Sequence, residues 1–431
     1  MITMNRIAQA ALLAGFCVNI FLQVLVIDTN YGGALGFTAL SPPIRMAATL
    51  TMIACGLASI LISKRILVDA LTVGLATYLA LGIAVGLTRE HATYEFARHV
   101  FAGTTMLAAY WCGISLRGTM IDEQLFKALA IATALAGVIA LAISIPMMHG
   151  FGFTLSPSPT LVVLDALMHG SSKLLLLLWI PVLVFANRRA FFLAIAFMMS
   201  ILITRRLLKG YPTPVRWSAT AVVTAATFAA LIAATHVAGS VVARLGGEDQ
   251  AFERAARMVG TVTAPTESAA PINDSAPTST PAAEKPAEMT RMDKLLSGRI
   301  SQGRAVLEAI SLSPILGNGF GAQYTWRYWS DNLNSLQTVT LAQTDGMPFY
   351  FLLTNGIVGL AIPLLIVAAL ASLFSRSLRG GMGIGALFVL GFAVDMMLTF
   401  QPNAHLFWLL LGFYSGLRTW EFAWRRTAEP L

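Results

Sequence analysis

The feature that most constrains the fold of this chain is a series of long apolar runs. A bilayer core is about 30 Å thick, so a helix needs about 20 apolar residues to cross it. Every backbone polar group inside hydrocarbon must be bonded internally, and each long run is therefore predicted to be a helix. Eleven clear runs are present: 7–27, 44–63, 66–87, 98–116, 125–147, 172–187, 190–204, 217–239, 348–375, 383–400 and 404–424.

The composition agrees with a membrane fold. Only 12% of the residues are charged, against about 25% in soluble domains. The first run is long enough to span and is not followed by a small-residue cleavage site, so we expect it to be a retained span. The formal charge of +8 comes from Lys and Arg beside apolar runs, a pattern that orients membrane proteins and does not indicate nucleic-acid binding. We expect an all-α polytopic membrane protein.

Clusters of Lys and Arg predict the topology, because cytoplasmic loops are enriched in positive charge. These clusters assign both termini, 205–216 and 376–382 to the cytoplasm, and they assign 240–347 and 401–405 to the outside. The two halves of the chain agree only if 152–171, a run interrupted by Pro and Gly, also crosses. About twelve transmembrane helices are therefore expected.

Three parts follow from this topology: an N-terminal transmembrane bundle (1–239), a large outer loop (240–347) and C-terminal transmembrane helices (348–431). Within the loop, 261–289 is almost entirely Thr, Ala, Pro, Ser and acidic residues, which predicts disorder. Residues 291–312 place apolar side chains at helical spacing, and Pro314 ends that helix before a glycine-rich turn. A folded helix beyond a disordered linker indicates a lid over a site at the membrane surface.

Arginine is the first candidate for chemistry at the outer face. Arg188 and Arg189 fall outside in this topology, against the usual orientation of positive charge, and an anionic ligand would explain them. In the loop, Arg299 and Arg304 are about 500° apart around a helix and do not share a face. At most one of them points with Arg291 or Arg188 into a common pocket; solvated surface arginines are the alternative. Arginines from different segments can hold a pyrophosphate group.

A carboxylate and a histidine are candidate bases at the same face. Asp345 immediately precedes an apolar run, where it either accepts a proton from a sugar hydroxyl or caps a helix that has Pro348 near its start. His405, in the outer turn before the last run, is the second candidate. His91 and His99 flank another helix pair and are interpreted as polar interface residues.

Two further features have open interpretations. The aromatic cluster that contains Tyr324 and Trp326 is either an interfacial belt or a platform on which sugars stack. Asp395 lies within an apolar run, and it is either functional or part of an interhelical hydrogen bond. The three cysteines all fall in apolar runs without metal-like spacing, so neither a metal nor a disulfide framework is expected.

Three short motifs carry a resemblance to a known family. Arg299 stands fifteen residues before the turn Pro314-Ile315-Leu316-Gly317-Asn318-Gly319. The triplet Asn187-Arg188-Arg189 opens an apolar run, and Asp345-Gly346 opens a run that contains Gly356-Ile357-Val358-Gly359-Leu360. In these motifs and in its layout the chain resembles the bacterial O-antigen ligase and polymerase superfamily, membrane glycosyltransferases that use undecaprenyl-pyrophosphate-linked glycans. The local matches cover about sixty residues after 297 and a short stretch near 187.

The resemblance implies a GT-C-like fold in a bacterial inner membrane, without a cofactor. It implies that Arg188 and Arg299 hold the leaving pyrophosphate, with Arg304 or Arg189 assisting, and that Asp345 is the base. Expected partners are a lipid-linked oligosaccharide, membrane lipids, a chain-length regulator and export proteins. Ligases carry His where this chain has Asp345, and this departure favours exopolysaccharide polymerases of the xanthan-polymerase type. A ligase acting on a lipid A core or a protein is the first alternative, and a transporter or flippase of lipid-linked sugars is the second.

Overall fold

The structure is a computed structural model, and it describes part of the chain. The described residues are 14–18, 41–63, 65–115, 131, 189–244, 299–330, 335–344, 346–379, 384–398, 400 and 404–423. They include two helices that are long and apolar enough to cross a membrane, Ala70–Leu87 and Ala361–Leu378. The predicted crossing of 152–171, the run 172–187 and the predicted disorder of 261–289 lie outside the described residues.

Helices dominate both halves of the described chain. The first half contributes α2 (Ser41–Ser63), β1 (Arg65–Asp69), α3 (Ala70–Leu87), α4 (Thr93–Ser115), α8 (Arg189–Leu207) and α9 (Thr213–Arg244). The second half contributes α12 (Arg299–Ala309), β2 (Tyr324–Ser330), β3 (Ser335–Leu341), α13 (Met347–Gly359), α14 (Ala361–Arg379), α15 (Ile384–Leu398), α16 (His405–Tyr414) and β4 (Thr419–Ala423).

Two predicted helical runs contain strands, which corrects an entirely α-helical assignment. The run 66–87 starts as β1 before α3 begins, and the run 404–424 leaves α16 at Tyr414 and ends in β4. The two strands pair antiparallel, with Arg65 opposite Ala423 and Asp69 opposite Thr419. Apolar content alone does not distinguish a short buried strand from the start of a helix, so hydropathy merged each strand with its neighbouring helix.

The predicted single span 348–375 is two helices. α13 departs from helical geometry at Asn355, with φ −125°, and at Gly356, with φ +59°. Both ends of α13 lie at the same end of the bundle. Gln343, before α13, is bonded to Arg98 at the start of α4. The last turn of α13 is bonded to residues 314–315, and the turn that they begin is bonded to the end of α3. α14 is therefore the long helix of this run, and α13 does not cross the bundle.

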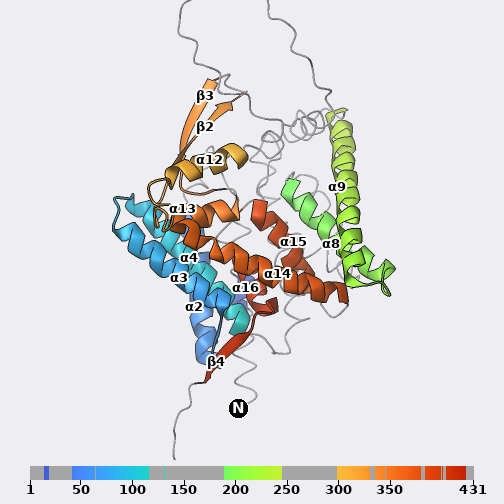
Figure 1. The fold of residues 1–431 in the computed structure, drawn as a ribbon, viewed down its shortest axis with the longest axis horizontal. Helices are drawn as coiled ribbons and strands as arrows, with labels where there is room; N and C mark the ends of the chain where they lie inside the picture. Colours follow the sequence, from blue (N-terminus) through green and yellow to red (C-terminus); the bar gives the residue numbers. More distant parts are fainter. Residues whose placement is uncertain are drawn as a thin grey trace, which may run out of the picture.

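The elements define two opposite ends of the bundle (Figure 1). β2, β3 and α12 lie at one, here named the loop end, and β4 lies at the other, the sheet end. At the loop end, Arg98 at the start of α4 donates to Gln343 before α13. At the other end of the bundle, Arg216 in the first turn of α9 donates to Leu378 at the end of α14. The pattern of Lys and Arg in the sequence also predicts one side of the membrane for Arg98 and Gln343 and the opposite side for Arg216 and Leu378. It assigns the loop end to the outside.

Small residues bring α4 and α16 into direct backbone contact. A Cβ added at Gly113 would lie 2.0 Å from the carbonyl oxygen of Leu409, and one at Gly412 would lie 2.1 Å from that of Tyr110. Glycine at both positions allows the helix axes to approach closely, as is common where helices pack in membranes. Around this contact, the buried core includes the rings of Trp408 and Phe407.

A buried carboxylate joins the strand pair to the bundle. Asp69 is fully buried and caps α3, because its Oδ1 accepts from the backbone N–H of Thr72 at 2.9 Å. Its Oδ2 accepts from the hydroxyl of Tyr110 at 2.7 Å, and the hydroxyl of Ser415 lies 3.1 Å from that of Tyr110. β1, α4 and the end of α16 are thus bonded through one side chain.

We expect Asp69→Ala to lower the free energy of unfolding by about 2–4 kcal/mol, because it removes a helix cap and leaves the buried hydroxyl of Tyr110 without this acceptor. Asp69→Asn keeps one amide oxygen for the cap and should cost less than half as much. Equilibrium unfolding of the three proteins in mixed micelles, followed by tryptophan fluorescence, measures the difference. A change below about 0.5 kcal/mol for Asp69→Ala would show that the network does not stabilise the fold.

The two ends of the bundle should face opposite sides of the membrane. In a cysteine-free background, we expect a membrane-impermeant maleimide to label Thr338→Cys, on β3, in intact spheroplasts. Gly210→Cys, in the exposed turn between α8 and α9, should be labelled only after the membrane is permeabilised. Labelling of both positions in intact spheroplasts would contradict this topology.

Candidate functional site

A glycine-rich turn docks the segment between α12 and β2 onto the loop end of the bundle. This glycine turn, residues 314–321, lies against the break in α13. The backbone N–H of Asn318 donates to the carbonyl of Leu353 at 3.1 Å, and that of Gly319 donates to the carbonyl of Thr354 at 2.8 Å. In return, the N–H of Ile357 donates to the carbonyl of Pro314 at 2.9 Å. The broken helix and the turn therefore satisfy one another's backbone groups.

The turn also contacts α3 closely. Gly319 has φ +76°, and a Cβ there would lie 2.3 Å from the backbone nitrogen of Gly86. The next N–H, that of Phe320, donates to the carbonyl of Gly82 at 2.8 Å. The ring of Phe320 is fully buried over Gly82 and beside Tyr78, with ring centroids 5.2 Å apart. Only a glycine fits at position 319, and Phe320 anchors the turn in the bundle.

Asn318 connects the turn to two other segments. Its Oδ1 accepts from Arg89 at 3.0 Å, its Nδ2 donates to the carbonyl of Ala309 at 2.8 Å, and its own carbonyl accepts from Nε2 of His91 at 2.9 Å. Ala309 is the last residue of α12, while Arg89 and His91 lie in the link between α3 and α4. The position of α12 is thereby fixed relative to the bundle.

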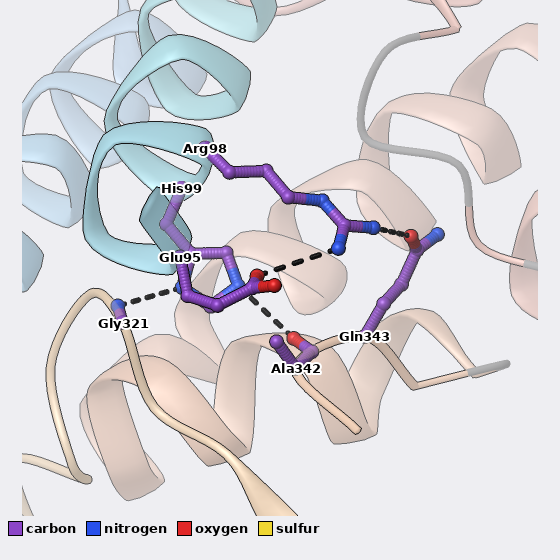
Figure 2. Close-up of polar contacts among 6 residues, drawn as sticks. All are labelled: Glu95, Arg98, His99, Gly321, Ala342 and Gln343. Atoms are coloured by element: carbon purple, nitrogen blue, oxygen red, sulfur yellow. Dashed lines mark hydrogen bonds and ion pairs between the residues drawn. The ribbon is translucent and has the colours of Figure 1, made fainter. Parts of the chain in front are cut away.

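The first turns of α4 hold the chain on both sides of the β2–β3 hairpin (Figure 2). Nδ1 of His99 accepts from the backbone N–H of Gly321 at 2.8 Å, and its Nε2 donates to the carbonyl of Ala342 at 3.0 Å. Arg98 donates to Oε1 of Gln343 at 2.8 Å and pairs with Glu95 at 3.3 Å. Two successive residues of α4 therefore bind two successive residues of the link before α13.

α12 packs on the start of α13 through small and aliphatic residues. Val306 of α12 and Ile310, the residue directly after it, are buried in a cluster with Leu353 of α13. A Cβ at Gly303 would lie 2.6 Å from the ring of Phe349, and one at Gly346 would lie 3.0 Å from the same ring. The ring of Phe349 is thus in close range of both the middle of α12 and the residue that follows Asp345 in the chain.

The structure places only some of the predicted arginines. Arg304 is exposed on α12, one residue after the buried Gly303. Arg299 is the first residue of α12 and Arg189 the first residue of α8, and only their backbones are described. The other predicted positions, Arg188, Arg291 and Asp345, lie outside the described residues. The predicted arginine clamp and the base therefore stay predictions.

Two predicted contact residues are buried in this conformation. Tyr324 is 2% exposed, and its hydroxyl donates to the carbonyl of Gln343 at 3.2 Å. His405, the second candidate base, is 1% exposed at the start of α16. Trp326 is partly buried and donates from Nε1 to the hydroxyl of Ser301 at 3.2 Å. Tyr324 and Trp326 thus hold the hairpin to α12 and to the link.

The sequence does not single out the residues of α4, and of the link before it, that bind the loop. The sequence predicts His91 and His99 to be interface residues of a helix pair, and no pattern marks Arg89 or Arg98. All four lie between residues 88 and 99, which the topology prediction places on the same face as the loop. The predicted location of these residues on the same face as the loop was the available indication. It does not reveal which of the segments on that face the loop contacts.

No protein-family model, curated protein or solved structure matched this chain. Among the described residues, no group of three or more His, Cys, Asp or Glu side chains is placed to hold a metal ion.

We expect Gly319→Ala to loosen the glycine turn and the β2–β3 hairpin from the bundle, because the added Cβ would collide with the backbone of Gly86 at a positive φ. A strained position of this kind costs about 1–3 kcal/mol. Trypsin cleavage at the exposed Arg327 on β2, measured in nanodiscs, should become at least about fivefold faster. Gly210→Ala is the matched control, because a Cβ there has nothing within 4 Å. Equal cleavage rates in both variants would contradict the role of the turn.

Proposed function

We propose that this protein is a polysaccharide polymerase of a bacterial inner membrane. It transfers a growing glycan from undecaprenyl pyrophosphate to a lipid-linked repeat unit, and the loop end of the bundle is its active side on the periplasmic face. The proposal rests on the resemblance of the loop motifs to the O-antigen ligase and polymerase superfamily, and on the geometry of the segments that carry those motifs.

The observation that carries the proposal is the docking of α12 against the start of α13. α12 carries Arg304 and begins at Arg299. The packing of Phe349 near both Gly303 and Gly346 brings that helix close to the residue after Asp345. Loop arginines and a carboxylate close to them are what a transfer from a pyrophosphate carrier requires, since one side of the reaction releases a polyanion and the other releases a proton.

The proposed reaction is a displacement at the anomeric carbon of the donor glycan. The bond between that carbon and the pyrophosphate oxygen breaks, and a bond to the acceptor hydroxyl oxygen forms. Asp345 accepts the hydroxyl proton, while the leaving polyprenyl pyrophosphate keeps the bonding electrons. Arg188 and Arg299, assisted by Arg304 or Arg189, neutralise the charge that develops on the leaving group. The atoms and charges of the proposed reaction are accounted for without a nucleotide sugar or a metal.

A polymerase is preferred over a ligase on a single residue, the aspartate at position 345 in place of the ligase histidine. A carrier that rocks between two states is less consistent with the described loop, because the glycine turn is bonded to α3 and α13 and the link is bonded to α4. These bonds keep the loop at one end of the bundle.

We expect Asp345→Asn and Arg299→Gln to reduce polymer formation by about 100-fold or more, the usual effect of removing a general base or a charge that stabilises the transition state. Arg206→Gln is the matched control, an exposed arginine in the last turn of α8, away from the loop. The measurement is the glycan chain-length distribution in cells and in nanodiscs supplied with lipid-linked repeat units and a chelator.

The expected product of both site variants is single exported repeat units without long chains, while Arg206→Gln makes normal polymer. Full-length polymer in both site variants would refute the site assignment. If preformed polymer is instead transferred to a lipid A core or a protein by the purified wild type, the protein is a ligase. Transport of lipid-linked sugar across the bilayer without bond transfer would identify a flippase.

A further inference from the structure

One imidazole ring is hydrogen-bonded to the chain on both sides of the β2–β3 hairpin. His99 of α4 accepts from Gly321, the last residue of the glycine turn, and donates to Ala342, the first residue after β3. These two residues are separated by the whole hairpin, Tyr324–Leu341, and both are bonded to the same side chain (Figure 2). The separation between the entry and the exit of the hairpin is therefore set by the two nitrogens of one ring.

The two hydrogen bonds have opposite polarity, and this determines which side chains can replace His99. The acceptor at Nδ1 and the donor at Nε2 together require a neutral imidazole with its proton on Nε2. The ring is 3% exposed and lies edge-on to Phe320 and Tyr350, with centroids 6.0 and 5.7 Å away. An apolar ring would keep these contacts but would leave the N–H of Gly321 and the carbonyl of Ala342 without their partner.

Hydrogen bonds of the next residues after Ala342 restrain the chain further, toward Asp345. Arg98, the residue before His99, donates to Gln343, and Nε2 of Gln343 donates to the carbonyl of Phe400 before α16. The next residue, Thr344, is buried and donates from its hydroxyl to the carbonyl of Gly346 at 3.0 Å. The residues on both sides of position 345 are thus restrained, and the restraint on Ala342 begins at His99.

We propose that His99 is a positioning residue of the proposed transferase site, which fixes the spacing between the glycine turn and the link to Asp345 without contacting substrate. The kinetic part of this inference rests on the proposed function, and the structural part does not. Because His99 is buried, it acts on the geometry of the site and not on the affinity for the donor. A misplacement of about 1 Å in a reacting group costs about 100-fold in rate.

The structural part is tested by distances between spin labels in the full chain. Labels are attached at Tyr94→Cys, in the first turn of α4, and at Thr338→Cys, on β3, after Cys17, Cys55 and Cys112 are replaced by Ser; Tyr94 and Thr338 are both exposed. Three variants are compared with this parent in nanodiscs: His99→Phe keeps the ring packing, His99→Gln keeps one donor and one acceptor, and Thr104→Val is the control. The hydroxyl of Thr104 is bonded within α4 itself.

We expect one narrow distance distribution in the parent and in Thr104→Val, and a broad distribution in His99→Phe. His99→Gln should return most of the narrow population, since its amide can serve both backbone groups. If His99→Phe does not insert, His99→Met, which is apolar and without a ring, takes its place with the same expected result. A narrow distribution in the apolar variant would overturn the proposal.

The kinetic part is tested with polymer formation in the same samples. We expect kcat to fall about 10- to 100-fold in His99→Phe while KM for the lipid-linked donor changes less than about threefold. His99→Gln should recover most of kcat. An unchanged kcat together with a broad distance distribution would overturn the positioning role. If no protein in the series polymerises repeat units, the proposed function fails, and the distance data still decide whether His99 holds the hairpin.

Discussion

The structure of the loop end depends on the break in α13. Asn355 and Gly356 leave helical geometry inside an apolar segment, and backbone groups released there must find partners, since an unsatisfied polar group in an apolar environment costs several kcal/mol. The glycine turn supplies those partners, and the broken helix satisfies the turn in exchange. Neither segment has a complete set of backbone hydrogen bonds without the other. Separating the glycine turn from α13 would therefore leave backbone groups of both segments unsatisfied, in addition to breaking side-chain contacts.

This exchange also decides where the remaining loop elements lie. Once the glycine turn is fixed, Asn318 holds the end of α12 and Gly321 holds the start of the hairpin. The hairpin then returns at Ala342, where α4 binds it a second time through His99. The segment from Gly321 to Ala342 thus begins and ends against the same helix. The link to Asp345 is positioned by contacts that come from residues more than 200 positions earlier in the chain.

The sequence predicted the helices better than it predicted their junctions. Long apolar runs located α2, α4, α8, α9 and α15, and Pro314 with its glycines correctly indicated a turn after the loop helix. The break at Asn355-Gly356 was missed because one polar residue hardly changes the mean hydropathy of a run, although Asn-Gly is a turn signal in any context. The docking of the turn on Gly82 and Gly86 could not be predicted, since hydropathy and charge report the face of a segment and not its neighbour on that face.

The described arginines at the loop end differ in what their side chains contact. Arg89 and Arg98, on the bundle side, donate to Asn318 and Gln343, so their charge is used to hold the loop. Arg304, on the loop side, is exposed on α12, whose opposite face is buried against α13. A guanidinium that already donates to the protein has fewer donors left for a ligand. An exposed guanidinium on a docked helix keeps its bidentate donors for binding an anionic ligand. The sequence rule that places positive charge inside the cell cannot make this distinction, because it counts charges and not their partners.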